Sequence, residues 1–290
     1  MMTVAAQVTA LEAWLNDADR VLVGAGAGLS AAAGFDYGDT ETFARLFPDL
    51  ARQGFTAQYQ MIGRRLPQPQ LWGYWYRHVH HMRFADHGPN QIYLGVRDLI
   101  GEKDHFVHTS NVDSLFARNG FDPGHVHTPQ GDYALLQCTV PCSRRTWPVE
   151  PWLRRGLAGL DRASGCVTDA DALPRCPTCQ GPAFLNVRID QSFIDDHFGP
   201  VRRALNEWIE ARRDQKLLIL EIGAGFNTPA VVRCPMERLA RTSVNTRLVR
   251  INRDHPQIPT VLEDRGLSIR ADIAEVLDLI NIPSRKQKPA

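Results

Sequence analysis

Residues 20–34 read RVLVGAGAGLSAAAG. The apolar run that opens this stretch is expected to form a short strand, and it leads directly into Gly24, Gly26 and Gly28. Glycines after a strand let the backbone approach a ligand closely, and a helix that begins near Ser30, which could cap it, would point free amides at an anion. This order predicts a pyrophosphate-binding turn. A plain tight turn remains open, because Leu29 interrupts the usual G-x-G-x-x-G spacing.

The order of strand, loop and helix recurs along most of the chain. Periodicity predicts strands at 105–108, 216–222 and 247–251, and helices at 3–15, 41–47, 70–83, 91–100, 201–213 and 271–281. We therefore predict an α/β fold, with a parallel sheet that has helices on both faces. Periodicity fails between 138 and 182, where Pro, Gly, Cys and Trp accumulate. We expect a small inserted domain at 134–186 within a sheet domain formed by 1–133 and 187–290.

Composition excludes several classes of protein. The 290 residues are 43% hydrophobic and 22% charged, which is typical of a globular chain and not of a disordered or fibrous one. Lys and Arg number 33 and Asp and Glu 32, so nothing in the charge favours a nucleic-acid or membrane-surface partner. The apolar runs are too short to span a bilayer, and the first residues do not resemble a signal peptide. We therefore expect a cytoplasmic protein.

Four of the six cysteines stand as two close pairs. They are Cys138, Cys142, Cys176 and Cys179. Paired thiolates in a reducing compartment are typical of a closed structural zinc site, which leaves no position for a catalytic water. Iron and unliganded core cysteines are the alternatives, and Cys166 is a possible substitute ligand.

A second glycine-rich turn, Gly223–Thr228, follows the apolar strand at 216–222. Asn111, Asp113 and Asn252 also stand at the predicted ends of strands. Ligands of open α/β sheets bind beyond the carboxyl ends of strands, where the strand order reverses. We expect these loops to line a crevice that binds a dinucleotide.

In this order, the motifs resemble those of the sirtuins. The first glycine turn, 24–34, resembles the family's first nucleotide loop, and Thr109-Ser110-Asn111-Val112-Asp113 resembles its T-Q-N-I-D motif. Gln130-Gly131 stands where the family has His-Gly, and the paired cysteines match its zinc module. Gly223–Thr228 matches its G-T-S turn and Leu248–Asn252 its late ribose-contacting strand. The resemblance covers about residues 20–280.

The resemblance implies an NAD-binding Rossmann-like domain, a small domain that holds Zn²⁺, and a set of site residues. Its catalytic residues would be Asn111, Asp113 and Gln130. Its NAD contacts would be Gly24, Ala25, Gly26, Leu29, Ser30, Tyr37, Ser110, Asn111, Val112, Asp113, Gly223, Gly225, Phe226, Asn227, Asn252, Arg253, Asp272 and Ile273. Tyr37 belongs to a segment, Gly34–Gly38, that is shortened relative to the family's G-I-P-D-F-R and lacks its Arg.

Gln130 changes the expected chemistry. An imidazole can take a proton from a ribose hydroxyl, which sirtuin deacylation needs, whereas a carboxamide cannot. Transfer of ADP-ribose to a nucleophile needs only an oriented and stabilised cationic sugar. The Gln-for-His pattern resembles the macrodomain-linked class M sirtuins, which implies a protein ADP-ribosyltransferase. The resemblance also implies a lipoylated carrier protein of the glycine-cleavage type as acceptor, and a link to a macrodomain ADP-ribosylhydrolase.

Two other functions stay open at this point. The chain could be a deacylase with a displaced base, such as His127, although we expect His127 to be an ordinary strand residue. It could also bind NAD or ADP-ribose without catalysis. The group His78, His80 and His81 is expected to be solvated on a surface helix, and the nearby Trp72, Trp75 and Tyr76 to serve in packing.

Overall fold

The computed structural model describes residues 2–280, and within them the chain divides into two compact units. The sheet unit comprises Met1–Gly34, Gly88–Gln130 and Phe198–Ala290, of which the last ten residues of the predicted sheet domain, 281–290, lie outside the described part. The cysteine unit comprises Phe35–His87 and Gly131–His197. It is larger than the insertion predicted at 134–186, because a helix in the segment 35–87 packs against a helix in the cysteine segment.

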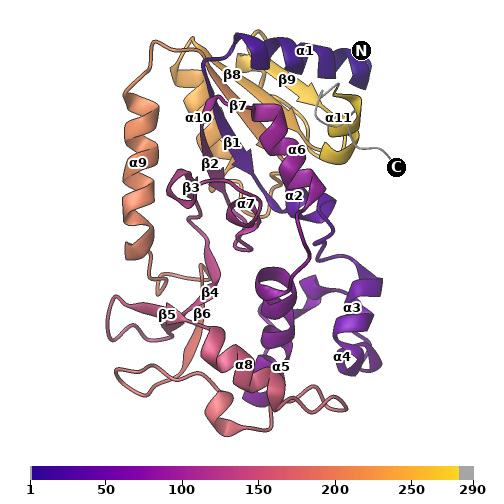
Figure 1. Cartoon of the computed structure of the whole chain (residues 1–290), viewed down its shortest axis with the longest axis vertical. Helices are drawn as coiled ribbons and strands as arrows, with labels where there is room; N and C mark the ends of the chain where they lie inside the picture. Colours follow the sequence, from indigo (N-terminus) through magenta and orange to yellow (C-terminus); the bar gives the residue numbers. More distant parts are fainter. Residues whose placement is uncertain (1, 281–290) are drawn as a thin grey trace. The chain divides into compact units, whose positions relative to one another are not determined.

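The sheet unit is built on six parallel strands in the order β3-β2-β1-β7-β8-β9 (Figure 1). Their bounds are β1 Arg20–Ala25, β2 Asp104–Thr109, β3 Val126–His127, β7 Leu217–Ile222, β8 Thr246–Ile251 and β9 Gly266–Ile269. The chain runs outward from β1 to β3, returns to β7 beside β1, and runs outward again to β9. The strand order therefore reverses between β1 and β7, which is where open sheets bind ligands.

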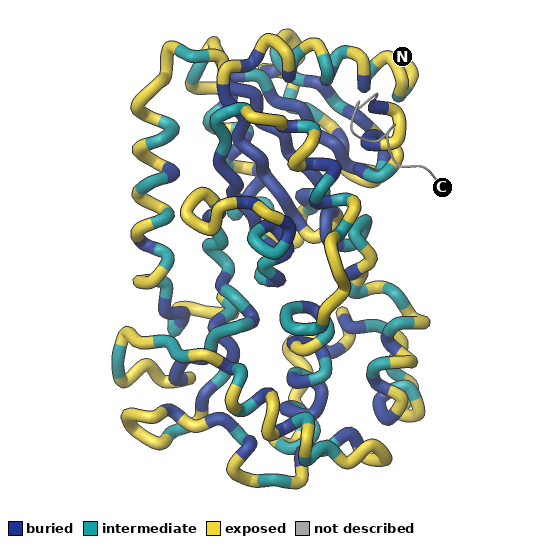
Figure 2. Tube along the Cα trace, in the orientation of Figure 1, coloured by how far each residue is buried: buried dark blue, intermediate teal, exposed yellow. Residues whose placement is uncertain are grey.

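Helices cover both faces of this sheet and bury its strands (Figure 2). They are α1 Val4–Asp17, α2 Ala27–Ala32, α6 Gln91–Ile100, α7 Leu115–Arg118, α9 Gly199–Glu210, α10 Arg233–Thr242 and α11 Ile273–Leu279. Leu205 of α9 and Met236 of α10 share one core cluster with Leu22 and Ile219 of the central strands. This arrangement confirms the predicted α/β class.

Local differences from the predicted elements concern helix starts and weak strands. Ser30 does not cap a helix: α2 begins at Ala27 behind Gly26, and Ser30 is buried inside it. The short strand β9 and the helix α10 lie in segments where periodicity had predicted no element. Most predicted elements, such as the helix at 91–100, lie within a few residues of their expected positions.

The cysteine unit combines a three-stranded antiparallel sheet, ordered β5-β4-β6, with short helices. Its elements are α3 Thr40–Leu46, α4 Pro48–Arg52, α5 Gln68–Val79, β4 Gly131–Cys138, β5 Thr146–Pro148, α8 Glu150–Ala158 and β6 Ala183–Val187, with a π-helical turn at His80–Phe84. Phe43, Phe47, Leu50 and Tyr74 belong to its hydrophobic core.

The helix α5 corrects one prediction of the sequence and agrees with another. His78 is buried and not solvated, because its Nδ1 bonds Gln58 Oε1 at 2.5 Å and its ring packs on Tyr74 and Trp75. Trp72 and Tyr76 are buried as packing residues, as expected. No helix between residues 2 and 280 is long and apolar enough to cross a membrane.

Candidate functional site

The two glycine turns lie against each other where the strand order reverses. Gly26 N donates to Ile222 O and Gly28 N to Gly223 O, both at 3.0 Å, so the turn after β1 is bonded to the end of β7. A Cβ at Gly26 would lie 2.6 Å from Ala224 Cα, and one at Gly28 2.7 Å from Gly223 Cα. The two backbones approach so closely that only glycine fits at these positions.

A pair of glycine substitutions tests this contact. Gly26→Ala should destabilise the sheet unit by roughly 1–3 kcal/mol, because the added methyl overlaps backbone that has no room to move. Gly225→Ala is the matched control in the facing turn, where an added Cβ meets nothing within 4 Å. Urea unfolding measures both, and equal stability of the two variants would contradict the close approach.

A buried polar network at the ends of β1 and β2 joins three of the predicted site residues. Asn111 Nδ2 donates to Gly26 O at 3.1 Å and to Ser30 Oγ at 3.0 Å. Ser30 Oγ donates to Asp113 Oδ2 at 2.6 Å. All three side chains are at least nine-tenths buried. The T-x-N-x-D segment and the first glycine turn are joined by hydrogen bonds that span 81 to 85 residues of sequence, so they form one site.

The network leaves one acceptor of Asn111 unused. Gly26 O can only accept, so the Asn111 atom that faces it is the amide nitrogen, and both amide protons are taken. The Asn111 Oδ1 accepts no hydrogen bond from any residue within 2–280. A ligand hydroxyl is therefore the natural donor to this oxygen.

Tyr93 belongs to the same network, and sequence reasoning missed it. Its hydroxyl lies 3.1 Å from Ser30 Oγ. Because the Ser30 hydroxyl donates its only proton to Asp113, the Tyr93 hydroxyl must be the donor to Ser30 Oγ. Burial, with the Asp113 charge second, raises the pKa of Tyr93 well above its usual value, so the proton stays on. The clue in the sequence was its place in the amphipathic helix at 91–100, which showed burial and not a polar contact.

The remaining predicted contacts lie at the carboxyl ends of the strands or after β9. Asn252 Nδ2 donates to Ala224 O at 3.0 Å, while its Oδ1 accepts from the amides of Asp254 and His255, so it ties the loop after β8 to the second glycine turn. Exposed side chains next to it are Phe226, Asn227 and Arg253. Partly or fully buried residues at the other loops are Gly24, Ala25, Leu29, Ser110, Val112, Gly223 and Gly225.

Three predicted contacts have structural partners of their own. Asp272 caps α11 by accepting from Ala274 N at 2.9 Å, and Ile273 is buried below it. Tyr37 belongs to the cysteine unit, where its hydroxyl lies 2.6 Å from that of Tyr133 and 3.3 Å from His78 Nε2. Their contact with a nucleotide stays a prediction.

Gln130 ends the segment that follows β3, and it is half-buried. Its carboxamide makes no hydrogen bond to any described residue. It is therefore available to a ligand as donor and as acceptor, but it offers no group that takes up a proton at neutral pH.

His127, three residues earlier, is a buried strand residue paired with His108. The Val231 carbonyl lies 2.6 Å from His108 Nε2 and can only accept, so His108 carries its proton there. The two Nδ1 atoms are 3.0 Å apart, which makes His127 the donor between them. Burial, the His108 ring and the Arg202 charge lower the pKa of His127 to about 4.

The lowered pKa of His127 predicts how stability responds to acid. From pH 6.5 down to 4 the unfolded chain binds a proton on this imidazole that the folded chain excludes. Above pH 6.5 this imidazole is neutral in both states and does not change the free energy of unfolding. As the pH drops to 4, it lowers the free energy of unfolding by up to roughly 3 kcal/mol. His127→Gln should make the decline of stability shallower over this range.

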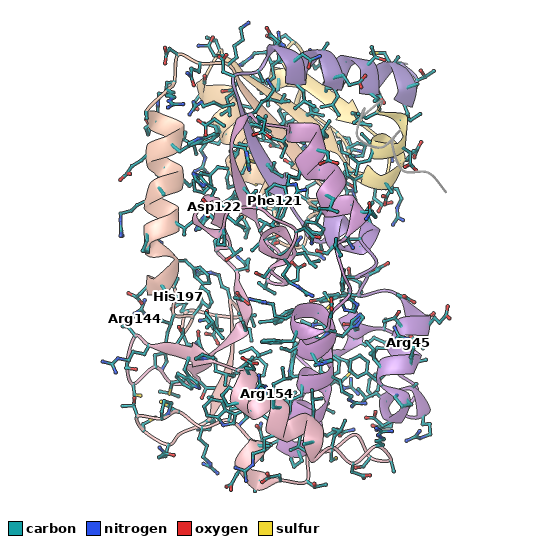
Figure 3. All side chains as sticks on the ribbon, in the orientation of Figure 1. Arg45, Phe121, Asp122, Arg144, Arg154 and His197 are labelled. Carbon is teal, nitrogen blue, oxygen red and sulfur yellow. The ribbon has the colours of Figure 1, made fainter. Side chains whose placement is uncertain are left out.

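Urea unfolding at successive pH values measures the decline. The matched control is His125→Gln, since this exposed imidazole two residues away pairs with Asp122, which Figure 3 labels. An unchanged slope in His127→Gln would refute the buried neutral imidazole.

A four-cysteine group in the cysteine unit could hold a metal ion. The sulfurs of Cys138, Cys142, Cys176 and Cys179 all lie within 4.8 Å of one another. Two separations, 3.7 Å between Cys138 and Cys179 and 3.5 Å between Cys142 and Cys176, are close to the ~3.8 Å edge of a tetrahedron with metal–sulfur bonds of about 2.3 Å. The donor set therefore fits a tetrahedral metal ion, and Cys166 is outside the group.

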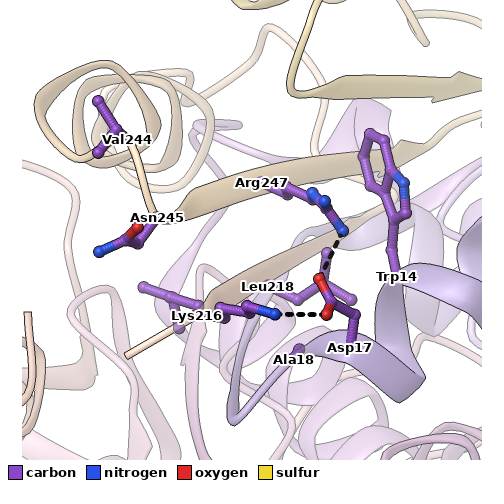
Figure 4. Close-up of a pocket in the computed structure, with 9 residues that line it drawn as sticks. Trp14, Asp17, Ala18, Lys216, Leu218, Val244, Asn245 and Arg247 are labelled. Carbon is purple, nitrogen blue, oxygen red and sulfur yellow. Dashed lines mark hydrogen bonds and ion pairs between the residues drawn. The ribbon is translucent and has the colours of Figure 1, made fainter. Parts of the chain in front are cut away.

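A separate small hollow lies at the amino ends of β1, β7 and β8, opposite the glycine turns (Figure 4). Asp17 pairs there with Lys216 at 2.6 Å and with Arg247 at 3.0 Å, beside Trp14. Its cavity volume of about 130 Å³ is well below the ~300 Å³ at which small-molecule pockets begin. It is therefore too small to compete as a nucleotide site.

Comparison with known proteins places the chain among sirtuin folds. No protein-family model matches it. It is 34% identical over 277 residues to a probable bifunctional ADP-ribose hydrolase/ADP-ribosyltransferase of Fusarium oxysporum, covering 92% of this chain and 46% of that protein. It is 28% identical over 279 residues to a protein ADP-ribosyltransferase of Staphylococcus aureus, covering 93% and 86%. This chain thus spans about half of the Fusarium relative.

Solved structures agree on the fold. A Sir2 homolog–NAD complex superposes with a TM-score of 0.56 at 18% identity, covering 93% of this chain and 91% of that one. A sirtuin solved in a study of substrate affinity gives 0.55 at 19% identity, covering 93% and 95%. The resemblance seen in the sequence is confirmed at the level of the fold.

Proposed function

We propose that this chain, which has the sirtuin fold, is an enzyme that transfers ADP-ribose from NAD to a protein and releases nicotinamide. The observation that carries the proposal is the buried Ser30–Asn111–Asp113 network beside two close-packed glycine turns. The names of the two curated relatives support the activity.

Each part of the site has a chemical task in this reaction. The amides of Gly26, Gly28 and Gly223 are bonded within the protein, so other amides of the two turns, such as those of Ala27 and Gly225, would bind the pyrophosphate. The unused Asn111 Oδ1 would accept from a ribose hydroxyl and orient the sugar. Asp113, fixed by Ser30 Oγ and by Leu115 N at 2.9 Å, places a negative charge at the end of β2 that would stabilise a cationic sugar.

The transfer step needs little acid–base help. The bond between ribose C1′ and the pyridinium nitrogen breaks, its electron pair leaves with neutral nicotinamide, and a nucleophilic atom of the acceptor bonds C1′ and gives up its proton. Gln130 would hold ribose hydroxyls without taking their protons. His127 is a poor substitute base, because its pKa is held near 4. This chemistry favours transfer over deacylation.

The finer assignments follow from the resemblance and the donor set. We propose structural Zn²⁺ on the four cysteines, where it would only hold the two knuckles together, and a reducing compartment such as the cytoplasm, where thiolates persist. We also propose a lipoylated carrier protein as acceptor. The Fusarium relative, whose name joins a hydrolase to a transferase, supports a functional link to an ADP-ribose hydrolase that reverses the modification.

One incubation separates the candidate functions. The full chain is mixed with NAD labelled in its ADP-ribose half, with a carrier protein in lipoylated and unlipoylated form, and with an acetyl-lysine peptide. Labelled protein, equimolar nicotinamide and an intact peptide are expected. Deacetylation of the peptide would establish the deacylase instead, and NAD binding without nicotinamide release would establish a non-catalytic binding module.

A further inference from the structure

No hydrogen bond of its own holds the side chain of Gln130. Its carboxamide bonds no residue between 2 and 280, so packing and the backbone set its direction. A group that must meet a ribose hydroxyl at hydrogen-bonding distance has to be held within a fraction of an ångström. The residues that fix the backbone next to Gln130 therefore decide how well it can act.

The backbone directly after Gln130 turns at Gly131, the first residue of β4. Gly131 has a φ of 114°, a conformation strained for any other residue, and it pairs with Val187 of β6. A Cβ at this position would lie 2.0 Å from Asn186 O. Glycine is thus required here, but it is also the residue with the greatest backbone freedom. A further restraint is needed to keep this turn in one conformation.

Asp132, the next residue, supplies that restraint. Its Oδ1 accepts from Ala134 N at 2.7 Å and from Arg83 Nε at 3.0 Å, and its Oδ2 lies 3.5 Å from Arg83 Nη2. The carboxylate therefore bonds its own strand and a planar guanidinium that approaches with two nitrogens. The side chains of Arg83 and Asp132 are 22% and 25% exposed, so water screens this pair less than the exposed pair of Arg155 with Asp169.

Arg83 comes from an unusual element of the chain. It lies in the π-helical turn His80–Phe84 that follows α5, and this turn is closed by Ala85 N, which donates to His80 O at 2.6 Å. Turns of this kind are rare and occur frequently at functional sites. The π-helical turn presents Arg83 to Asp132, which lies 49 residues later in the sequence.

We propose that Arg83 and Asp132 are positioning residues for ADP-ribosyl transfer and that they act through Gln130. The pair lies entirely within the cysteine unit and fixes β4 at its first residues, so it sets the direction of the peptide bond between Gln130 and Gly131. Without the pair, the turn at Gly131 would be free to move and the carboxamide would move with it. A shift of about 1 Å in a group that orients a substrate costs up to roughly 100-fold in rate. This inference rests on the proposed function.

A double-mutant cycle tests whether the pair acts through Gln130. Arg83→Gln should slow the transfer of labelled ADP-ribose about ten-fold or more and leave the KM for NAD nearly unchanged, because the groups that bind the rest of NAD are unaltered. In a chain that already carries Gln130→Ala, Arg83→Gln should cause no further loss, since the effects of residues that act through one another do not add.

Asp132→Asn gives a second, milder test, which serves also if Arg83→Gln fails to fold. It keeps the shape of the side chain and its bond from Ala134 N but removes the charge that Arg83 pairs with. Its loss of rate should be smaller, and it should likewise vanish in the Gln130→Ala chain. Urea unfolding confirms that each variant is folded.

Arg155→Gln is the matched control, because it removes an exposed arginine of the same unit that pairs with Asp169. It should keep the full rate of transfer. An undiminished rate in the folded variants of Arg83 and Asp132, or a loss that adds in full to that of Gln130→Ala, would overturn this inference and leave the transferase intact. An unaltered chain that releases no nicotinamide from NAD would overturn the proposed function and the inference together.

Discussion

Asn111→Ala should abolish most of the transfer of ADP-ribose while the chain still folds. The substitution removes the Oδ1 that we assign to the ribose and releases Ser30 Oγ and Gly26 O from their donor. Loss of a group that orients and stabilises the reacting sugar costs roughly 100-fold or more in rate. The lost hydrogen bonds should lower the free energy of unfolding by only about 1–3 kcal/mol. Initial rates with labelled NAD and urea unfolding measure the two effects.

Asn119→Ala is the matched control for this prediction. Asn119 is another buried asparagine of the sheet unit, and it too makes two side-chain hydrogen bonds, from Asn90 N at 2.7 Å and to Leu115 O at 2.8 Å. It should lose comparable stability and keep its transfer rate. Undiminished transfer in Asn111→Ala, or an equal loss of rate in both variants, would contradict the assignment of Asn111 to the site.

The second large effect is expected at the cysteine group. Cys176→Ser removes a fully buried sulfur that lies 3.5 Å from Cys142 Sγ. The free energy of metal binding in such sites is folding free energy, so the variant should lose its bound metal and its melting temperature should fall by roughly 10 °C or more. Metal analysis of the purified protein and a thermal melt give the two readouts.

Cys166→Ser provides the control, since it changes a cysteine of the same unit that is outside the group. It should keep one metal ion per chain and an unaltered melt. A chain that purifies with no metal, or a Cys176→Ser variant that binds it as well as the parent, would remove the metal from these residues.

The sequence foretold the parts of the site whose cause is local. Where two backbones approach closely, only glycine fits, and the glycine can be read from the sequence. The turns at 24–28 and 223–228, and their positions after buried strands, could therefore be predicted. Two close pairs of cysteines likewise predict a metal-binding group, and the structure brings the four sulfurs within 4.8 Å of one another. Each of these signals needs only a few neighbouring residues.

The errors concern side chains whose role depends on partners far away in the sequence. Ser30 was expected as a helix cap, but its partner Asp113 lies 83 residues later, and the helix begins earlier at Ala27. The sequence predicts a solvated His78, because histidine is a polar residue, but Gln58 and two aromatic rings bury it. Neither contact leaves a local pattern, since burial of a polar side chain is decided by what folds over it.

The strand order has a consequence for how the protein is made. β1 pairs on one side with β2 and on the other with β7, which leaves the ribosome only after about 200 further residues have been added. At ~5–20 residues per second that is a delay of roughly 10–40 s. During it the apolar edge of β1 has no neighbour, while both halves of the cysteine unit, 35–87 and 131–197, are completed. The nucleotide site needs β1 and β7 side by side, so it forms only after this delay, and until then the unpaired edge of β1 is the kind of strand edge that promotes aggregation.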